Sequence, residues 1–381
     1  MWPSPVTVRP PGPWLHSATW DGVVILGSGL LVAVPLVTYY AVATLTGTPP
    51  QAFQESQALG IAMLINLAVA FLIGGPHVYA TLTTTLAERR FRERHPLLLR
   101  AALLVPVGVI ALTSLRIELL LAVFFAWASV HVVHQLTYLV WQYQARGSDP
   151  LPRWSRAIDY VLVVSCLYPI ALWRMLAPDG AVLPLPFGLE IAPGFFIGRV
   201  DIGRELPAAF AGQVWIAWTA GTVFALAAAA FAARTVWEWR TGGLLWPRTL
   251  LLAASAPVAF AVPMVANADV ALQGLNLWHS AQYLGLVYLM NGQRKARGEI
   301  SSWWVRRLSG AGNGRWYYAF VVGVAVAAGG LIGVLHYGAG FPMLQAYYCV
   351  HFSALLVHYL WDHAVFTQMG ALTPVAAAVA R

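Results

Sequence analysis

The sequence predicts an all-α protein that crosses a membrane many times, and three observations support this. Of its 381 residues, 59% are apolar and only 10% are charged, whereas roughly a quarter of a soluble domain is charged. The mean hydropathy is +0.66. The apolar residues form runs of about 20, which is the length of a membrane-spanning helix. We therefore expect a polytopic transmembrane helix bundle, with residues 1–381 forming a single membrane domain.

About ten apolar runs are long enough to span a bilayer. They cover 22–45, 57–83, 97–115, 118–143, 156–177, 208–234, 245–266, 269–291, 316–337 and 343–367. Arginine is concentrated in alternate loops, for example around Arg90, Arg153, Arg240 and Arg306, and is sparse in the loops between them. Because Lys and Arg accumulate in cytoplasmic loops, we expect both termini on the cytoplasmic side. The expected location is a bacterial-type inner membrane.

Three segments outside the spans have a distinct composition. Residues 1–20 are rich in Pro and Trp and lack the pattern of a secretory signal, so we expect an interfacial N-terminal segment. Residues 178–207 are Pro-rich and should form an external cap or a re-entrant segment. Residues 292–315 form a basic loop, in which Trp303 and Trp304 predict an interfacial helix.

Charge and cysteine content exclude other classes. The net charge of +8 comes from the arginine-rich loops, where membrane topology explains it, and we expect no nucleic-acid partner. Cys166 and Cys349 both lie within predicted spans, so neither a disulfide framework nor a CxxC motif is present. The expected partners are membrane lipids, a hydrophobic small-molecule or lipid substrate, and an electron donor on the cytoplasmic side.

Histidines inside the spans provide the strongest functional signal. Ionisable groups are costly at membrane depth and usually serve a function. The expected metal ligands lie on spans that all run from outside to inside, and most fall in the inner half: His77, His131, His134, His279, His351, His358, Asp362 and His363. On a helical wheel His351, His358 and Asp362 fall within about 40° of one another, whereas His363 projects about 100° away. The sequence therefore predicts a shared intramembrane metal site.

Other polar side chains accompany these histidines on the same helix faces. Asn66, Gln135, Tyr138, Asn276, Gln282 and Tyr283 are of the types that fix the imidazole nitrogen that does not bind metal. Thr81, Thr83, Thr84 and Thr85 are instead expected to bond their own helix backbone.

Several imidazoles with one carboxylate and no thiolate favour Fe, Zn, Mn or Cu. Zinc hydrolysis usually needs only three protein ligands, so the larger set favours one or two non-haem Fe ions that activate O₂ against a lipid-soluble substrate. His131-x-x-His134 and His358-x3-Asp362-His363 resemble the histidine clusters of integral-membrane non-haem iron oxygenases and desaturases. The standard histidine boxes of those families are absent. The resemblance implies a membrane-embedded, metal-dependent oxidoreductase.

Two other functions fit the same residues. Paired histidines on facing helices could hold haem b in a haem- or quinone-linked electron-transfer protein. A proton or metal-ion transporter could use the histidines and Asp362 as a relay. A haem absorption band would identify the first alternative, and ion movement across sealed vesicles would identify the second.

Overall fold

The computed structural model describes residues 12–48, 56–147, 151–185, 190–197, 199–265, 267–310 and 312–368. Their secondary structure is almost entirely helical, which confirms the all-α class. Eight helical segments are long and apolar enough to cross a membrane: Ala18–Leu45, Ser56–Thr83, Pro96–Leu115, Ile117–Gln144, Arg153–Leu176, Trp215–Thr241, Trp246–Met264 and Gly314–Gly338. These lengths and compositions are those of a multi-pass membrane protein.

Most predicted spans match these helices within a few residues. The exception is 208–234, because the helix α10 runs from Trp215 to Thr241 and includes Arg234 and Arg240. The two remaining predicted spans form α12 (Ala268–Ala296) and α15 (Met343–Gln368). Both are long enough to cross a bilayer, at about 1.5 Å per residue. They lie outside the set of eight, and both carry polar residues of the predicted site.

The chain divides into two compact units. Unit 1 comprises Met1–Ile25, Ala68–Gln135 and His279–Arg381, and unit 2 comprises Leu26–Leu67 and Leu136–Trp278. The helices α7 (Ile117–Gln144) and α12 contribute residues to both units.

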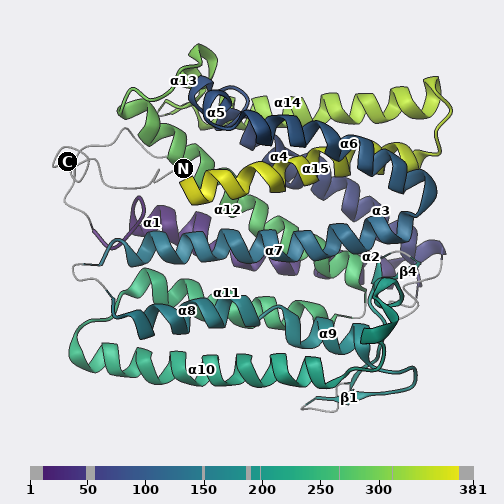
Figure 1. Ribbon diagram of the computed structural model, residues 1–381, viewed down its shortest axis with the longest axis horizontal. Helices are drawn as coiled ribbons and strands as arrows, with labels where there is room; N and C mark the ends of the chain where they lie inside the picture. Colours follow the sequence, from purple (N-terminus) through teal and green to yellow (C-terminus); the bar gives the residue numbers. More distant parts are fainter. Residues whose placement is uncertain are drawn as a thin grey trace. The chain divides into compact units, whose positions relative to one another are not determined.

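Unit 1 is built around α15, which packs against α6 (Pro96–Leu115), α14 (Gly314–Gly333) and α4 (Gly75–Ala80) (Figure 1). Its other elements are α1 (Ala18–Trp20), η1 (Asp21–Leu26), η3 (Ala70–Gly74), η4 (Thr81–Thr83), α5 (Arg89–Arg94), α13 (Trp303–Leu308) and η9 (Val334–Gly338). The helix α13 lies within the basic loop 292–315.

The second predicted span is irregular next to His77. The segment η3 is a π-helix, and Pro76 follows it without a backbone N–H to continue the ladder. A Cβ on Gly75 would lie 2.3 Å from the carbonyl oxygen of Ala70 and 3.3 Å from the Cβ of Ala325. Glycine at this position therefore allows α4 to pack closely on α14.

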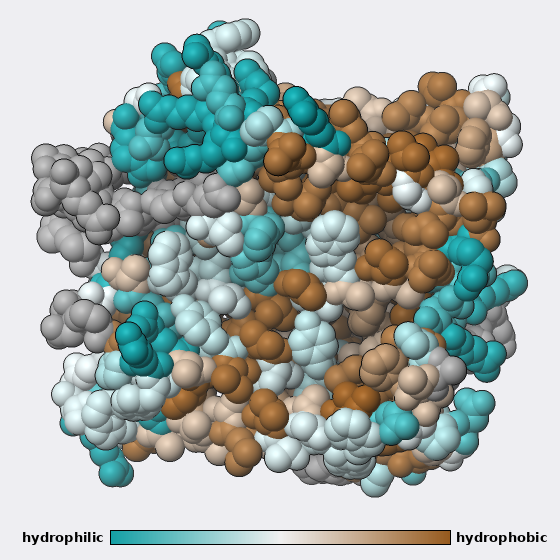
Figure 2. Space-filling view, viewed as in Figure 1, coloured by the Kyte–Doolittle hydropathy of each residue, from teal (hydrophilic) through white to brown (hydrophobic). Residues whose placement is uncertain are grey.

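The surface of unit 1 changes character along its helices. Figure 2 shows apolar side chains gathered over α6 and α14 and hydrophilic ones over α5 and α13. On α6, Leu97, Leu103 and Leu104 are 75%, 73% and 71% exposed. Exposed apolar side chains in such numbers are unfavourable in water and favourable in lipid. This surface is therefore suited to hydrocarbon, with the arginine-rich helices beyond its edge.

In unit 2, α10 packs against α8 (Arg153–Ser165) and α9 (Tyr168–Leu176), and α11 (Trp246–Ala261) packs against both and against η2 (Gly27–Val32). The remaining elements are α2 (Ala33–Leu45), α3 (Ser56–Val69), η6 (Ile202–Glu205), η7 (Ala208–Phe210) and η8 (Val262–Met264).

The described part of 178–207 forms short strands and a turn of helix. The strand β1 (Leu183–Pro184) pairs with β2 (Glu190–Ile191), and β3 (Phe196–Ile197) pairs with β4 (Val200–Asp201), both antiparallel. Arg174 donates from Nε to the carbonyl oxygen of Gly194 at 2.9 Å and from Nη1 to that of Val265 at 2.7 Å. This arginine thus ties the segment to the helices of unit 2.

Two arginines of unit 2, Arg234 and Arg248, are buried. Arg234 Nη2 lies 2.6 Å from Asp159 Oδ1, and Arg248 Nε lies 3.8 Å from Asp159 Oδ2. Glu238 pairs with both arginines. None of the four side chains is more than 4% exposed. Because two positive and two negative charges compensate one another here, α10 extends past Arg234 without leaving this buried arginine unpaired.

Candidate metal centre

Four of the histidines singled out from the sequence converge in unit 1. His77 comes from α4, His131 from α7, His279 from α12 and His358 from α15. One ring nitrogen of each belongs to a group whose members all lie within 4.8 Å of one another. The four side chains are buried, with 1–4% of each residue exposed. Helices distant in the sequence therefore deliver four imidazoles to one point.

The four rings form a closed circle. Ring centroids lie 5.2 Å apart for His77 and His279, 4.8 Å for His279 and His131, 4.9 Å for His131 and His358, and 4.8 Å for His358 and His77. Each pair meets edge to face. The Nε2 atoms of His131 and His279 are 3.1 Å apart. Each imidazole is thereby held by its two neighbours.

Asp362 borders this circle. Its Oδ2 lies 3.5 Å from His358 Nε2 and 3.8 Å from His131 Nε2. Its Oδ1 accepts hydrogen bonds from the Tyr283 hydroxyl at 2.6 Å and the Thr81 hydroxyl at 3.2 Å. The carboxylate is fully buried. One oxygen is thus fixed by two hydroxyl groups, and the other is directed towards the imidazoles.

In two of the rings the second imidazole nitrogen, Nδ1, is also hydrogen-bonded. His77 Nδ1 bonds the carbonyl oxygen of Gly74 and lies 2.8 Å from Ser280 Oγ. His358 Nδ1 lies 2.5 Å from Thr81 Oγ1. A ring that donates through Nδ1 keeps a lone pair on Nε2, which is the tautomer that binds a metal. These bonds therefore prepare both Nε2 atoms as ligands.

Several atoms of the group have no hydrogen-bond partner in the described part of the chain. They are His77 Nε2, His358 Nε2 and Asp362 Oδ2, together with His279 Nδ1. A buried polar atom without a partner costs about 1–3 kcal/mol. A cation between the first three atoms would remove that cost, so the donor set fits a metal ion.

The size of the group suits one ion. Imidazole nitrogens bind zinc at about 2.1 Å, so two on opposite sides of an ion are about 4.2 Å apart. The largest separation in the group, 4.8 Å, is close to that value. Two-metal sites have ions about 3.5–4 Å apart and need a wider ligand set.

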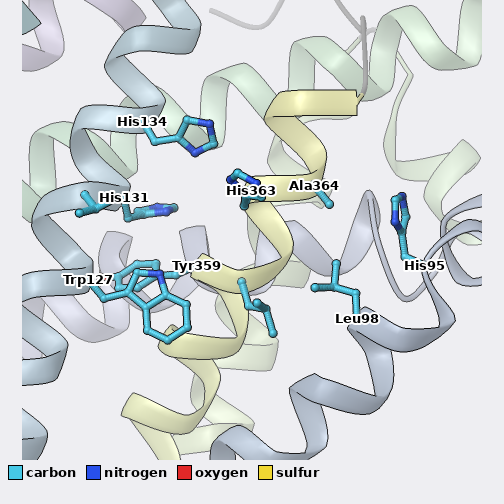
Figure 3. A pocket seen from close by; sticks show the side chains of 10 residues that line it. His95, Leu98, Trp127, His131, His134, Tyr359, His363 and Ala364 are labelled. Carbon is cyan, nitrogen blue, oxygen red and sulfur yellow. The ribbon is translucent and has the colours of Figure 1, made fainter. Parts of the chain in front are cut away.

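The other predicted ligands lie outside this group. His134 and His363 face each other with ring centroids 5.3 Å apart and line a pocket beside His131 (Figure 3). His351 stacks on Tyr347, with ring centroids 5.0 Å apart. The structure thus gathers His77, His131, His279, His358 and Asp362, and leaves His134, His351 and His363 apart from them.

The supporting side chains differ in what they bond. Tyr283 holds Asp362, whereas Gln135 donates to the carbonyl oxygen of His279 at 3.1 Å and Gln282 to that of Ile25 at 2.6 Å. The two glutamines therefore bond the backbone rather than imidazole nitrogens. The other three, Asn66, Tyr138 and Asn276, belong to unit 2.

Sequence reasoning missed two residues of the site. Thr83, Thr84 and Thr85 bond their own helix backbone as predicted. The prediction is wrong for Thr81, whose hydroxyl contacts His358, Tyr283 and Asp362. Ser280 was overlooked although it follows His279 directly. No protein-family model, curated protein or solved structure matches the chain.

Proposed function

We propose that the protein is a membrane-embedded metal-dependent oxidoreductase that uses one non-haem iron ion. The ligands would be His77, His131, His279 and His358, with Asp362 as the charged ligand. One observation carries this proposal: four buried imidazole nitrogens lie within 4.8 Å of one another beside a buried carboxylate oxygen.

Iron is favoured over other ions by the type and number of donors. Imidazole with carboxylate suits Fe, Zn, Cu or Mn, whereas Mg and Ca prefer oxygen ligands alone. Catalytic zinc usually has three protein ligands, fewer than are available here. Haem b is disfavoured because the porphyrin itself supplies four equatorial nitrogens to its iron, and here imidazoles crowd that space. The histidine cluster therefore supports non-haem iron more than haem.

Iron bound in this way would supply one-electron and O₂ chemistry to a lipid-soluble substrate. The protein contributes position, charge and dryness. Thr81 and Tyr283 orient Asp362, Gly74 and Ser280 orient His77, and burial of all five ligands excludes bulk water. Exclusion of water strengthens each electrostatic interaction within the site.

The membrane arrangement is part of the proposal. We infer that α12 and α15 also cross the bilayer, which gives ten spans with both termini on the cytoplasmic side. Their polar residues would face the interior of the protein, where four imidazoles and Asp362 satisfy one another through the metal. The arginine-rich helices α5 and α13 would mark the cytoplasmic end of unit 1.

Metal analysis of the purified protein tests this proposal. We expect about one iron per chain and no haem absorption band. His358→Ala and Asp362→Asn should each lower iron content and activity together, by more than the tenfold to hundredfold typical of a residue that only orients a ligand. His336→Ala is the matched control, because His336 bonds the carbonyl oxygen of Phe341 at 2.7 Å. Fully active protein without metal, or transport of ions by protein in sealed vesicles, would reject the proposal.

A further inference from the structure

A second feature of unit 1 lies directly beside the histidine circle. It is a pocket of about 390 Å³ whose lining includes His131, one of the four converging histidines. Pockets that bind small molecules have volumes of about 300–1,000 Å³. The pocket is therefore large enough to bring part of an organic molecule next to the proposed metal ligands.

Four histidines line the pocket: His95, His131, His134 and His363. Of these, His134 from α7 and His363 from α15 meet with ring centroids 5.3 Å apart, whereas Figure 3 shows His95 apart from them, beside Leu98. His134 is half-buried, His363 is exposed, and neither has a carboxylate partner in the described part of the chain. No acidic side chain is among the described residues that line the pocket. Each neutral imidazole carries one N–H donor and one acceptor nitrogen, so the pair can hydrogen-bond an oxygen-bearing group.

Apart from the histidines, the described lining of the pocket is apolar and aromatic. Trp127 lies two helical turns before His134 on α7, and Tyr359 stacks on His131 with ring centroids 4.2 Å apart. Leu98 and Leu360 complete this part of the wall. Along α7 the order is thus His134, His131 and Trp127, with adjacent members about 4.5–6 Å apart along the axis. A ligand that is polar at the histidine pair and apolar beyond it would pass His131 a few bonds from its polar end.

We propose that this pocket binds a single-chain amphiphile whose oxygen-bearing end is hydrogen-bonded by His134 and His363. This inference rests on the proposed function only in that the pocket would hold the substrate of the same site. In the proposed topology α7 runs inwards, so the polar end would face the cytoplasmic side and the chain would point into the bilayer. A lipid of the inner leaflet has that orientation, and the amphiphile could enter from it.

Photolabelling tests the inference with palmitic acid that carries a diazirine in its chain. Matched probes are the corresponding alcohol and the corresponding hydrocarbon, which lacks the oxygen. The purified full-length protein is labelled in phosphatidylcholine nanodiscs, and labelled residues are mapped by mass spectrometry. We expect the acid, the alcohol or both to label residues within 127–134 and within 359–364. Excess palmitate should displace this labelling. Each hydrogen bond should contribute about fivefold to binding.

The double variant His134→Phe and His363→Phe keeps aromatic rings and removes the N–H groups, so labelling should fall about 25-fold. His336→Phe should label like the unmodified protein, and an unchanged size-exclusion profile and thermal midpoint should show that the double variant is folded. Equal labelling by the hydrocarbon probe, or labelling spread over exposed α6 without competition, would overturn the inference. Purified protein that contains no iron but is labelled as expected would reject only the proposed function. Iron-loaded protein that is not labelled would reject only the pocket.

Discussion

Replacing Thr81 by Val tests whether the surroundings of His358 prepare it as a ligand. Valine has nearly the same shape as threonine but no hydroxyl group. The change removes the partner of His358 Nδ1 at 2.5 Å and one of the two donors to Asp362 Oδ1, at 3.2 Å. It also removes a contact of 2.7 Å with the Tyr283 hydroxyl. The side chains of all four proposed histidine ligands remain in place.

The magnitude follows from the bonds that are lost. Removing a partner that orients a metal ligand typically costs 10- to 100-fold in metal affinity, or about 1.4–2.7 kcal/mol. Thr81 contacts both His358 and Asp362, so we expect an effect near the upper end of that range. Thr81→Ser should retain most of the affinity, because serine keeps the hydroxyl group.

The assay is a titration of iron-loaded protein with a chelator, in which the concentration that removes half of the iron is measured. Thr85→Val is the control, since Thr85 is equally buried but bonds only the carbonyl oxygen of Thr81, at 2.7 Å. If Thr81→Val and Thr85→Val release iron at the same chelator concentration, the hydroxyl of Thr81 does not prepare the site. The reasoning from the hydrogen-bond geometry would then be refuted.

Two further predictions concern residues outside the circle. His351→Ala should leave the iron content within about twofold of the original, whereas His77→Ala should remove most of the iron, because a metal ligand contributes far more to binding than a residue outside the ligand set. Equal losses of iron in a metal analysis would place His351 among the ligands. Arg248→Met should lower the free energy of unfolding by about 3–5 kcal/mol, since it leaves the buried carboxylates of Asp159 and Glu238 with Arg234 as their one arginine. Exposed Arg240→Met is its control, and an unchanged thermal midpoint for Arg248→Met would contradict the buried network.

The spans could be predicted because their length and apolar composition are local properties of the sequence. The predicted span 208–234 ends at a charged residue, Arg234, whereas α10 continues to Thr241. An unpaired arginine at membrane depth is costly, so ending the helix at Arg234 was reasonable from one segment alone. The partner that removes this cost, Asp159, comes from α8 and pairs at 2.6 Å. A pairing between helices leaves no periodic signal within either one.

The candidate site was predicted in part for a related reason. A helical wheel places His351 and His358 on one face, but seven residues separate them by about 10.5 Å along the axis. Sharing a face therefore does not mean sharing a depth, and only His358 reaches the circle. Thr81 was misjudged because threonines in helices usually bond their own backbone, as its three neighbours do. Its role depends on the positions of α12 and α15.

The charge of the site explains why Asp362→Asn should be as damaging as the loss of a histidine. Four neutral imidazoles contribute donors but no charge, so a divalent ion in this dry site would be compensated only by Asp362, which lies 3.5 Å from His358 Nε2. Asparagine keeps the shape and one oxygen, and Tyr283 and Thr81 can still donate to it. The ion would nevertheless keep its full charge in a medium of low dielectric constant, where an uncompensated charge costs several kcal/mol. Asp362→Asn therefore separates the effect of charge from that of geometry. If this variant retains iron, the imidazoles alone hold the ion. If it loses iron, the negative charge of the carboxylate is required.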